Sequence, residues 1–127
     1  MSKYHNRQFT TSDGIVHDSH KEAMRWGWLK IQERIGEIRD LRTQVPFELI
    51  PAQREVSNEV YKKGSKKGQP KEGKLIEKPV TYIADFVYID TKTGETVVED
   101  SKGFRTKDYI IKRKLMLYVH GIRIKET

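Results

Sequence analysis

Residues 80–102 read VTYIADFVYIDTKTGETVVEDSK, and the remaining elements can be arranged around this stretch. Two runs rich in Val, Ile, Tyr and Phe flank TKTG, a pattern that predicts a β-hairpin with a four-residue connection. In that register Asp85 lies directly opposite Asp100, with their Cβ atoms about 4.5–5.5 Å apart. Alternation along the second strand places Lys102 on the same face as Asp100, and Glu99 on the other face. The hairpin therefore gathers two carboxylates and one ammonium group.

Asp85 is the one charged position in an otherwise apolar row that includes Ile83 and Val87. A carboxylate pair at this spacing is destabilising unless a proton or a hard cation lies between the two groups. Magnesium prefers oxygen ligands and is commonly held by one or two carboxylates, and the ammonium group of Lys102 can stabilise charge that grows on a phosphoryl oxygen. The alternative is a strand-edge pair of carboxylates that face solvent or a nearby lysine.

Turn, cap and periodicity signals predict the elements on either side of the hairpin. Ser19 and Glu22 have the spacing of a capping box, so Glu22 is expected at the start of a helix for structural reasons alone. Residues 52–78 hold eight Lys and Arg against four Glu, which favours a flexible basic loop inserted in the domain. The expected elements are a short hairpin over 8–17, helices over 20–35 and 106–119, and strands over 37–50, 80–90, 95–102 and 122–125.

Both predicted helices carry apolar residues at helical spacing. In the first helix, Trp26 and Leu29 lie on nearly the opposite side from a second apolar stripe. A helix with two apolar faces needs two contacts, one with the sheet and one with a partner subunit, and this favours a homodimer. The stripes are Met24, Trp28, Ile31 and Ile35 in the first helix and Ile111, Leu115 and Val119 in the second.

The length and composition of the chain limit the classes of protein to which it can belong. A chain of 127 residues is long enough for one domain, and its net charge of +7 favours a polyanionic partner, with nucleic acid first. The absence of Cys excludes disulfides, thiolate nucleophiles and Cys-based zinc sites. With no apolar run of membrane-spanning length and no signal peptide, we expect an intracellular protein without a membrane partner. Candidate contacts to nucleic acid are Lys62, Lys63, Lys66 and Lys67 in the loop and Arg105, Lys107, Lys112 and Arg113 around the second helix.

Asp85 followed by Asp100-Ser101-Lys102 across a hairpin resembles the signature of the PD-(D/E)XK nuclease superfamily, with Ala84 where the family often has Pro. The expected order of helix, three strands, helix and strand is similar to the core of that superfamily and covers nearly the whole chain. The strings HDSHKEAMRW, IGEIRDL, FELIPAQ, YIADFVYID and VVEDSKGFRTKDYIIKRKL are similar to a small phage and prophage family placed in it. Holliday-junction resolvases share this core.

The resemblance implies a single nuclease domain over residues 1–127 with a restriction-endonuclease-like α+β (α/β) fold. The fold has an αβββαβ core, a mixed central sheet flanked by helices, and an N-terminal hairpin. The implied activity is a Mg²⁺- or Mn²⁺-dependent endonuclease that hydrolyses DNA phosphodiester bonds. Branched DNA such as Holliday junctions is the implied substrate, in phage recombination or replication in the bacterial cytoplasm. The implied metal ligands are Asp85, Asp100, the backbone carbonyl of Ser101 and Glu22, and Lys102 is the implied catalytic lysine.

Several alternatives stay open at this point. A non-catalytic basic nucleic-acid-binding accessory protein would share the charge and the loop but would not need Asp85, Asp100 and Lys102 together. RNA cleavage is also open, because nothing in the sequence reports on recognition of the 2′-hydroxyl. Asp in place of Glu at position 100 shortens the reach of the side chain by one methylene. His17 and His20, near the start of the first helix, are weaker candidates for contacts to DNA.

Overall fold

The computed structural model describes residues 7–102 and 104–127. Its elements confirm an α+β domain, and their order from α1 onward contains the predicted αβββαβ core. The helices are α1 (His20–Arg34) and α2 (Lys107–His120), and the strands are β1 (Phe9–Thr10), β2 (Val16–His17), β3 (Ile38–Ile50), β4 (Gln53–Arg54), β5 (Leu75–Glu77), β6 (Val80–Asp90), β7 (Thr96–Asp100) and β8 (Lys125–Glu126).

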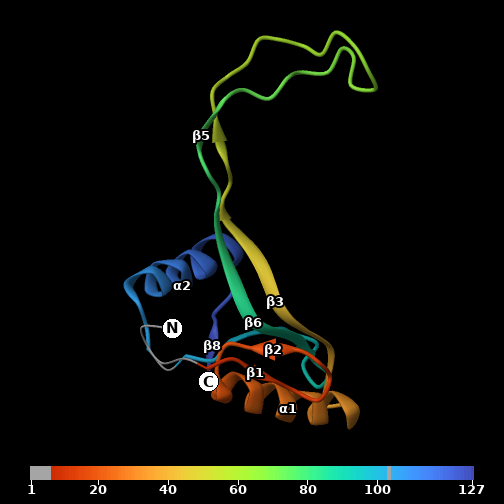
Figure 1. Cartoon of the computed structure of the whole chain (residues 1–127), viewed down its shortest axis with the longest axis vertical. Helices are drawn as coiled ribbons and strands as arrows, with labels where there is room; N and C mark the ends of the chain where they lie inside the picture. Colours follow the sequence, from red (N-terminus) through yellow and green to blue (C-terminus); the bar gives the residue numbers. More distant parts are fainter. Residues whose placement is uncertain (1–6, 103) are drawn as a thin grey trace.

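A mixed four-stranded sheet lies at the centre of the fold (Figure 1). Its strand order is β3-β6-β7-β8, with antiparallel pairing from β3 to β7 and parallel pairing between β7 and β8. The parallel pair follows from the chain path, because α2 carries the chain back across the sheet before β8 begins. β8 starts at Lys125, later than the predicted strand over 122–125, and Ile124 just before it is buried in the core.

The face of α1 that packs on the sheet contains Trp26 and Leu29. The Trp26 ring stacks on the ring of Phe86 of β6, with the ring centroids 5.9 Å apart. Ser19 caps the helix, and its side chain accepts a hydrogen bond from the backbone N–H of Glu22. The second apolar stripe is exposed and consists of Met24, Trp28, Ile31 and Ile35.

The packing face of α2 differs from the predicted stripe. Tyr109 and Met116 are buried against the sheet, whereas Ile111 is 56% exposed and Val119 46% exposed. Only Leu115 of the predicted stripe packs against the core. The prediction was wrong because it counted aliphatic residues alone, whereas the ring of Tyr109 packs toward that of Tyr82 on β6, with the ring centroids 6.4 Å apart.

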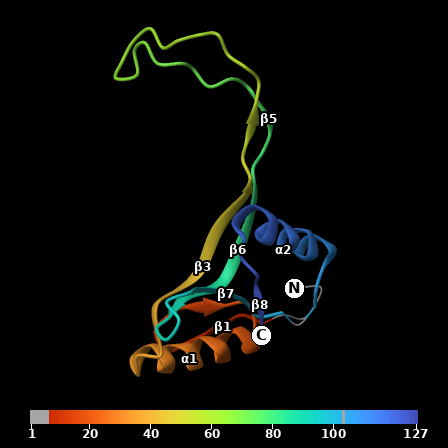
Figure 2. The ribbon, with the colours of Figure 1, turned by 180° about the vertical axis from the view of Figure 1, so that it is seen from behind.

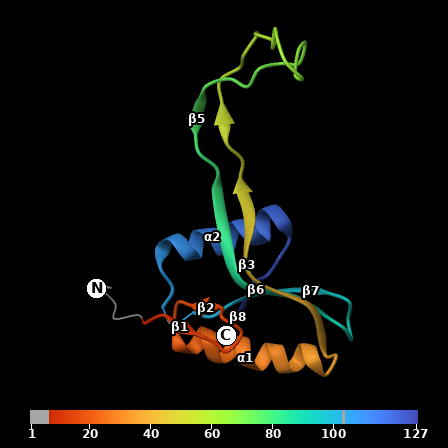
Figure 3. The ribbon, with the colours of Figure 1, turned by 45° about the vertical axis from the view of Figure 1, so that its right-hand side comes forward.

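β6 changes its packing partner halfway along its length. Tyr82 and Ala84 belong to the cluster formed with α2, whereas Phe86 and Tyr88 belong to the cluster formed with α1. Strict alternation would put all four on one face, but a long twisted strand turns its side chains relative to the layers above and below it. The division falls at Asp85. Figure 3 shows α1 and α2 at different sides of the sheet around this strand.

Residues 52–78 form a two-stranded extension, which we call the arm (Figure 1, Figure 2). β4 pairs with β5, and an isolated bridge joins Val60 to Pro70 further along. The arm continues the direction of β3 and β6 and projects past α2, away from α1. Its backbone is therefore paired over part of its length, and the flexibility expected from its composition stays a prediction.

The N-terminal hairpin has the predicted turn. β1 and β2 are antiparallel partners around Asp13-Gly14, and Gly14 has a φ of 84° that a glycine adopts without strain. The indole Nε1 of Trp26 donates to Asp13 Oδ2 at 2.6 Å, which fastens the hairpin to α1. Within the described parts of the chain, neither helix has the length and hydropathy that crossing a membrane requires.

Candidate active site

Asp85 and Asp100 occupy facing positions on neighbouring strands, as the sequence predicts. β6 and β7 pair Phe86 with Glu99 and Val87 with Val98, and one more step in this register sets Asp85 opposite Asp100. Asp85 Oδ2 accepts a hydrogen bond from the backbone N–H of Ser101 at 2.8 Å. This bond ties the Asp85 carboxylate to the end of the strand that carries Asp100.

Asp100 is almost completely buried, with 1% of its surface exposed. Its Oδ2 accepts a hydrogen bond from the hydroxyl of Tyr82 at 2.5 Å. Its Oδ1 is buried and accepts no hydrogen bond, although Lys102 Nζ lies 3.2 Å away. An open oxygen on a buried carboxylate is uncommon in folded proteins, since most buried polar atoms have a partner.

Lys102 directs its ammonium group back toward the carboxylates. Besides its contact with Asp100, Nζ lies 4.5 Å from the centroid of the Tyr109 ring on α2, in the position of a cation–π contact. The backbone carbonyl of Lys102 accepts a hydrogen bond from Lys21 Nζ at 3.1 Å. Both helices therefore hold the segment that follows β7.

Burial and neighbouring negative charges change the protonation of Asp85. Burial, followed by the negative charge of Asp100, raises the pKa of Asp85 to about 7. The charge of Glu22 acts in the same direction, whereas the hydrogen bond from Ser101 opposes the rise. Near neutral pH the Asp85 site is thus balanced between holding a proton and holding a negative charge, the situation that a bound cation would resolve.

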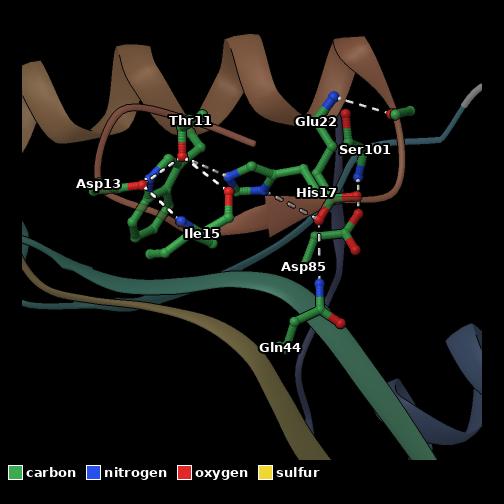
Figure 4. A network of polar contacts seen from close by, with 10 residues as sticks. Thr11, Asp13, Ile15, His17, Glu22, Gln44, Asp85 and Ser101 are labelled. Atoms are coloured by element: carbon green, nitrogen blue, oxygen red, sulfur yellow. Dashed lines mark hydrogen bonds and ion pairs between the residues drawn. The ribbon is translucent and has the colours of Figure 1, made fainter. Parts of the chain in front are cut away.

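Glu22, in the first turn of α1, lies on the side of Asp85 away from the cavity that Asp100 lines, and among the described residues it does not complete a three-carboxylate cluster. Its Oε1 accepts a hydrogen bond from Gln44 Nε2 at 3.1 Å and lies 3.7 Å from His17 Nδ1 (Figure 4). Burial, followed by the charge of Asp18, raises the pKa of the Glu22 carboxyl. The backbone of Glu22 takes part in the helix cap, as expected, while its carboxylate belongs to the polar network beside Asp85.

Gln44 is a site residue that sequence reasoning missed. It lies on β3 between Thr43 and Val45, which pair with Phe86 and Ala84, so it stands at the level of Asp85. Its φ is 54°, a left-handed conformation that is uncommon for a residue with a long side chain. Backbone strain of this kind concentrates at functional sites, and here it accompanies the hydrogen bond that holds Glu22.

His17 supports the site from within the core. It is 1% exposed, its Nε2 lies 3.4 Å from Thr11 Oγ1, and its ring packs 5.8 Å from that of Trp26 (Figure 4). Its Nδ1 has no hydrogen bond and faces Glu22. The structure therefore places His17 behind Glu22, and not on a surface where it could contact DNA. His20 packs its ring against that of Phe9.

A cavity of about 280 Å³ opens over the two aspartates. It follows β6 from Thr81 to Asp85, the part of the strand that leads toward the arm, and α2 forms its other wall. The charged and tyrosine side chains that line it are Asp85, Asp100, Asp108, Lys102, Lys112, Tyr82 and Tyr109. A substrate that enters here would meet the carboxylates and two basic side chains together.

The donor set fits a hard divalent cation. Asp85 and Asp100 offer carboxylate oxygens, and Asp100 Oδ1 is free of hydrogen bonds. Among residues 7–102 and 104–127, no three acidic or histidine side chains are gathered closely enough to form a ready metal site. Two carboxylates with water and phosphate completing the shell are a common arrangement for Mg²⁺. The roles of Ser101 and Glu22 as ligands stay predictions.

The predicted nucleic-acid contacts fall into two groups. In the arm, Lys62, Lys63, Lys66 and Lys67 are exposed. Around α2, Lys107 is exposed and Lys112 lines the cavity. Arg105 and Arg113 both form ion pairs with Glu126, at 2.6 and 3.5 Å, so part of their charge is engaged within the protein.

Glu99 points away from the cavity, as strand alternation predicts. It is fully buried, and both of its oxygens accept hydrogen bonds from the Arg25 guanidinium at 2.8 Å. The hydroxyl of Tyr88 also donates to Glu99 Oε2. This closed cluster joins α1 to β7. Sequence reasoning did not identify Arg25 as its partner, because the two residues lie far apart in the chain.

Comparisons with known proteins add a family assignment. No curated protein and no solved structure matches the chain. A family model described as "Protein of unknown function (DUF1064)" matches residues 1–125. The match covers nearly the whole sequence, including every residue of the cavity, and the chain therefore belongs to the DUF1064 family.

Proposed function

We propose that this protein is a divalent-metal-dependent endonuclease that hydrolyses phosphodiester bonds of DNA. The observation that carries the proposal is the facing pair of Asp85 and Asp100, with a buried Asp100 oxygen that accepts no hydrogen bond. A fold has no structural need for two facing carboxylates in a low-dielectric position, because their repulsion opposes folding. A divalent cation held between the two carboxylates would remove this repulsion.

The protein's own side chains would divide the work at the scissile phosphate. Lys102 Nζ, fixed between Asp100 Oδ1 and the Tyr109 ring, would stabilise charge that grows on a phosphoryl oxygen. The Tyr82 hydroxyl occupies Asp100 Oδ2 and so keeps the orientation of that carboxylate fixed. Lys112, at the α2 wall of the cavity, is placed to contact a neighbouring phosphate.

Asp85 and Asp100 would hold Mg²⁺ or Mn²⁺, with Glu22 and the Ser101 carbonyl as the further predicted donors. Such an ion supplies Lewis-acid stabilisation of phosphoryl oxygens and makes a nearby water more acidic. The Gln44 hydrogen bond would keep the Glu22 carboxylate beside Asp85. Branched DNA is the proposed substrate class, on the resemblance to Holliday-junction resolvases and on a positive surface suited to backbone contacts.

The test is cleavage of a labelled four-way junction and of a linear duplex in Mg²⁺, Mn²⁺ or EDTA. We expect junction cutting only with a divalent ion, and its loss in Asp85→Asn and in Lys102→Ala with binding retained. Asp90→Asn is the matched control, because Asp90 lies on the same strand outside the cavity. It should cut like the natural sequence.

Two outcomes would redirect the proposal. Cutting by Asp85→Asn and Lys102→Ala at the natural rate would remove the proposed mechanism. Tight binding without cutting under any divalent ion would favour the non-catalytic nucleic-acid-binding protein, which the exposed lysines of the arm support. A matched RNA junction in the same assay decides between DNA and RNA as the substrate.

We also propose a homodimer in the bacterial cytoplasm, where two sites would cut opposed strands. Its support is the exposed stripe of α1, in which Trp28 is 49% exposed and Met24 63% exposed. An exposed apolar stripe of this kind is typical of an interaction surface. Light scattering on the natural protein and on Trp28→Glu tests it, with a dimer expected for the first and a monomer for the second.

A further inference from the structure

The charges of the arm are unevenly distributed along its length. Residues 60–70, which we call the tip, contain four lysines and no acidic residue. Residues 52–59 and 71–78, which we call the stem, contain four basic and four acidic residues and are therefore neutral overall. The stem pairs part of its charge internally, with Lys71 3.6 Å from Glu59 and Arg54 3.7 Å from Glu72. The arm thus has a neutral spacer and a cationic end.

The stem has a defined geometry that depends on close backbone approach. Glu55 N donates to Lys74 O at 2.8 Å, and Lys71 N donates to Glu59 O at 2.9 Å. A Cβ at Gly73 would lie 1.7 Å from the backbone oxygen of Glu55, so only glycine allows the two segments to meet in this way. This glycine indicates that the shape of the stem, in addition to its composition, is specified by the sequence.

The tip is also organised, although its lysines are exposed. Tyr61 pairs with the opposite segment through Tyr61 N to Gln69 O at 3.0 Å and Gly68 N to Tyr61 O at 2.8 Å. Lys66 Nζ lies 5.7 Å from the centroid of the Tyr61 ring, a cation–π distance. The tip therefore presents its positive charges from a closed turn, and not from an extended tail.

The root of the arm adjoins the cavity. Val80 begins β6 and Thr81 already lines the cavity over the aspartates. The fourteen residues 71–84 separate the tip from Asp85, beside which the cleaved bond would lie, and at about 3.3 Å per residue they span at most about 46 Å. Stacked base pairs rise by about 3.4 Å, so this reach corresponds to at most about fourteen base pairs of duplex.

We propose that the tip is a second contact for the phosphate backbone of duplex nucleic acid, held by the stem and the start of β6 at most about fourteen base pairs from the bond at the cavity. The inference rests on the proposed function for the position of that bond. A neutral stem lets the duplex pass without a continuous contact, and the four tip lysines then bind phosphates on the same helical arm. The protein consequently selects substrates in which the duplex is long enough to reach the tip.

The experiment measures binding to four-way junctions whose arms are lengthened in steps, by fluorescence anisotropy in EDTA so that no cutting occurs. Affinity should rise on the order of tenfold once the duplex arms are long enough to reach the tip, at no more than about fourteen base pairs. Lys66→Gln/Lys67→Gln should remove most of that rise and lower the salt slope by about two units, since each phosphate contact contributes about 0.9. Lys74→Gln/Lys78→Gln, which removes the same charge from the stem, is the matched control and should change both values by less than half as much.

Gly73→Ala separates geometry from charge. It keeps every lysine but forces the stem apart at Glu55, so the affinity step should broaden or move to another arm length. A smooth dependence on length in the natural protein, or equal losses from the tip and stem variants, would overturn the inference. Cutting of junctions with short and long duplexes, assayed in parallel, keeps the two proposals distinguishable. A rise in affinity with duplex length but no cutting would contradict the nuclease proposal alone. Cutting without such a rise in affinity would contradict the second contact alone.

Discussion

Glu99 and Asp100 are neighbours on β7, and both are buried to 1% exposure or less. They face opposite sides of the sheet and meet opposite environments. Both oxygens of Glu99 are held by the Arg25 guanidinium, and Tyr88 adds a third hydrogen bond. Asp100 has one hydrogen bond, an ion pair with Lys102 at 3.2 Å through an oxygen that accepts no hydrogen bond, and another carboxylate across the strand pair. Burial alone therefore does not distinguish a structural carboxylate from a functional one.

The difference lies in whether the partner set is complete within the protein. A closed set such as that of Glu99 offsets the cost of burying the charge and fastens α1 to β7. An open set such as that of Asp100 leaves its charge to raise the pKa of Asp85, a perturbation that is typical of functional sites. Replacing each carboxylate with the corresponding amide should therefore have opposite effects: the change at Asp100 should lower activity, and the change at Glu99 should lower stability.

The largest effect is expected from Asp100→Asn on cleavage. The amide keeps the size of the side chain but removes one of two facing negative charges, so cutting should fall about 10²- to 10³-fold, the range for loss of one electrostatic group in an active site. The melting temperature in EDTA should stay the same or rise, because the repulsion with Asp85 is relieved. Single-turnover cleavage and thermal unfolding measure the two effects. A variant that cuts normally would contradict the functional assignment.

The next effect is the loss of stability in Glu99→Gln. Removing this charge leaves the Arg25 guanidinium without its partner, and we expect the free energy of unfolding to fall by about 3 kcal/mol. Arg25 keeps 21% of its side chain in solvent, which limits the loss. Urea denaturation provides the measurement, and cleavage per folded molecule should change little. Arg25→Gln is the control: the double variant should lose much less than the sum of the two single losses.

The open site should also make stability depend on pH. The pKa of Asp85 is about 7 in the folded protein, against 3.8 for an ordinary aspartate, so the folded state binds this proton more tightly than the unfolded chain. The contribution to stability is complete below about pH 4 and is lost as the pH rises through 7. In EDTA, as the pH is raised from about 4 through 7, the free energy of unfolding should therefore fall by at least about 1 kcal/mol more in the natural protein than in Asp85→Asn.

Divalent ions provide a control for this pH effect. At pH 8, Mg²⁺ at ten times its dissociation constant should raise the stability of the natural protein by about 1.4 kcal/mol through binding to the folded state. Asp85→Asn should gain little, whereas Glu99→Gln should gain as much as the natural protein. If Glu99→Gln instead loses the pH dependence, the two carboxylates are not electrostatically separate.

The opposite orientation of Glu99 and Asp100 could be predicted from the sequence because it depends on neighbours in the chain, whereas the Arg25 partner of Glu99 could not. TKTG sets the register of β6 and β7, and alternation then fixes which acid faces Asp85. The face of α2 could not be predicted in this way. The helix has apolar residues on more than one side, and Tyr109 is buried because its ring meets that of Tyr82, with centroids 6.4 Å apart, across a contact between distant segments.

The contribution of β3 to the site could also not be predicted from the sequence. Gly, Asn and Asp are the residues that commonly adopt left-handed backbone, so nothing in the string RTQVPFELI marks Gln44 as the left-handed position. Its hydrogen bond joins it to Glu22, which precedes it by a whole helix and a turn. Local patterns specified the two carboxylates of the hairpin, while the residues that surround them came together only through tertiary packing.

Gln44→Gly tests whether this strained position serves the open site, and it has the smallest expected effect on stability. Glycine relieves a left-handed conformation that costs roughly 1–2 kcal/mol in other residues, but it loses the hydrogen bond to Glu22 and adds flexibility to the unfolded chain. These terms nearly cancel, so stability should change by less than about 1 kcal/mol. Cleavage should fall roughly 10- to 100-fold, as for loss of a residue that orients a ligand.

Asp40→Gly is the matched control for this variant, because Asp40 has a φ of 55° on the same strand and does not line the cavity over the aspartates. It should relieve the same kind of strain and leave cleavage unchanged. Equal activity of the two glycine variants would mean that the left-handed backbone of β3 serves the path of the strand alone. Loss of activity in Gln44→Gly alone would extend the open site from the two aspartates on β6 and β7 to a third strand.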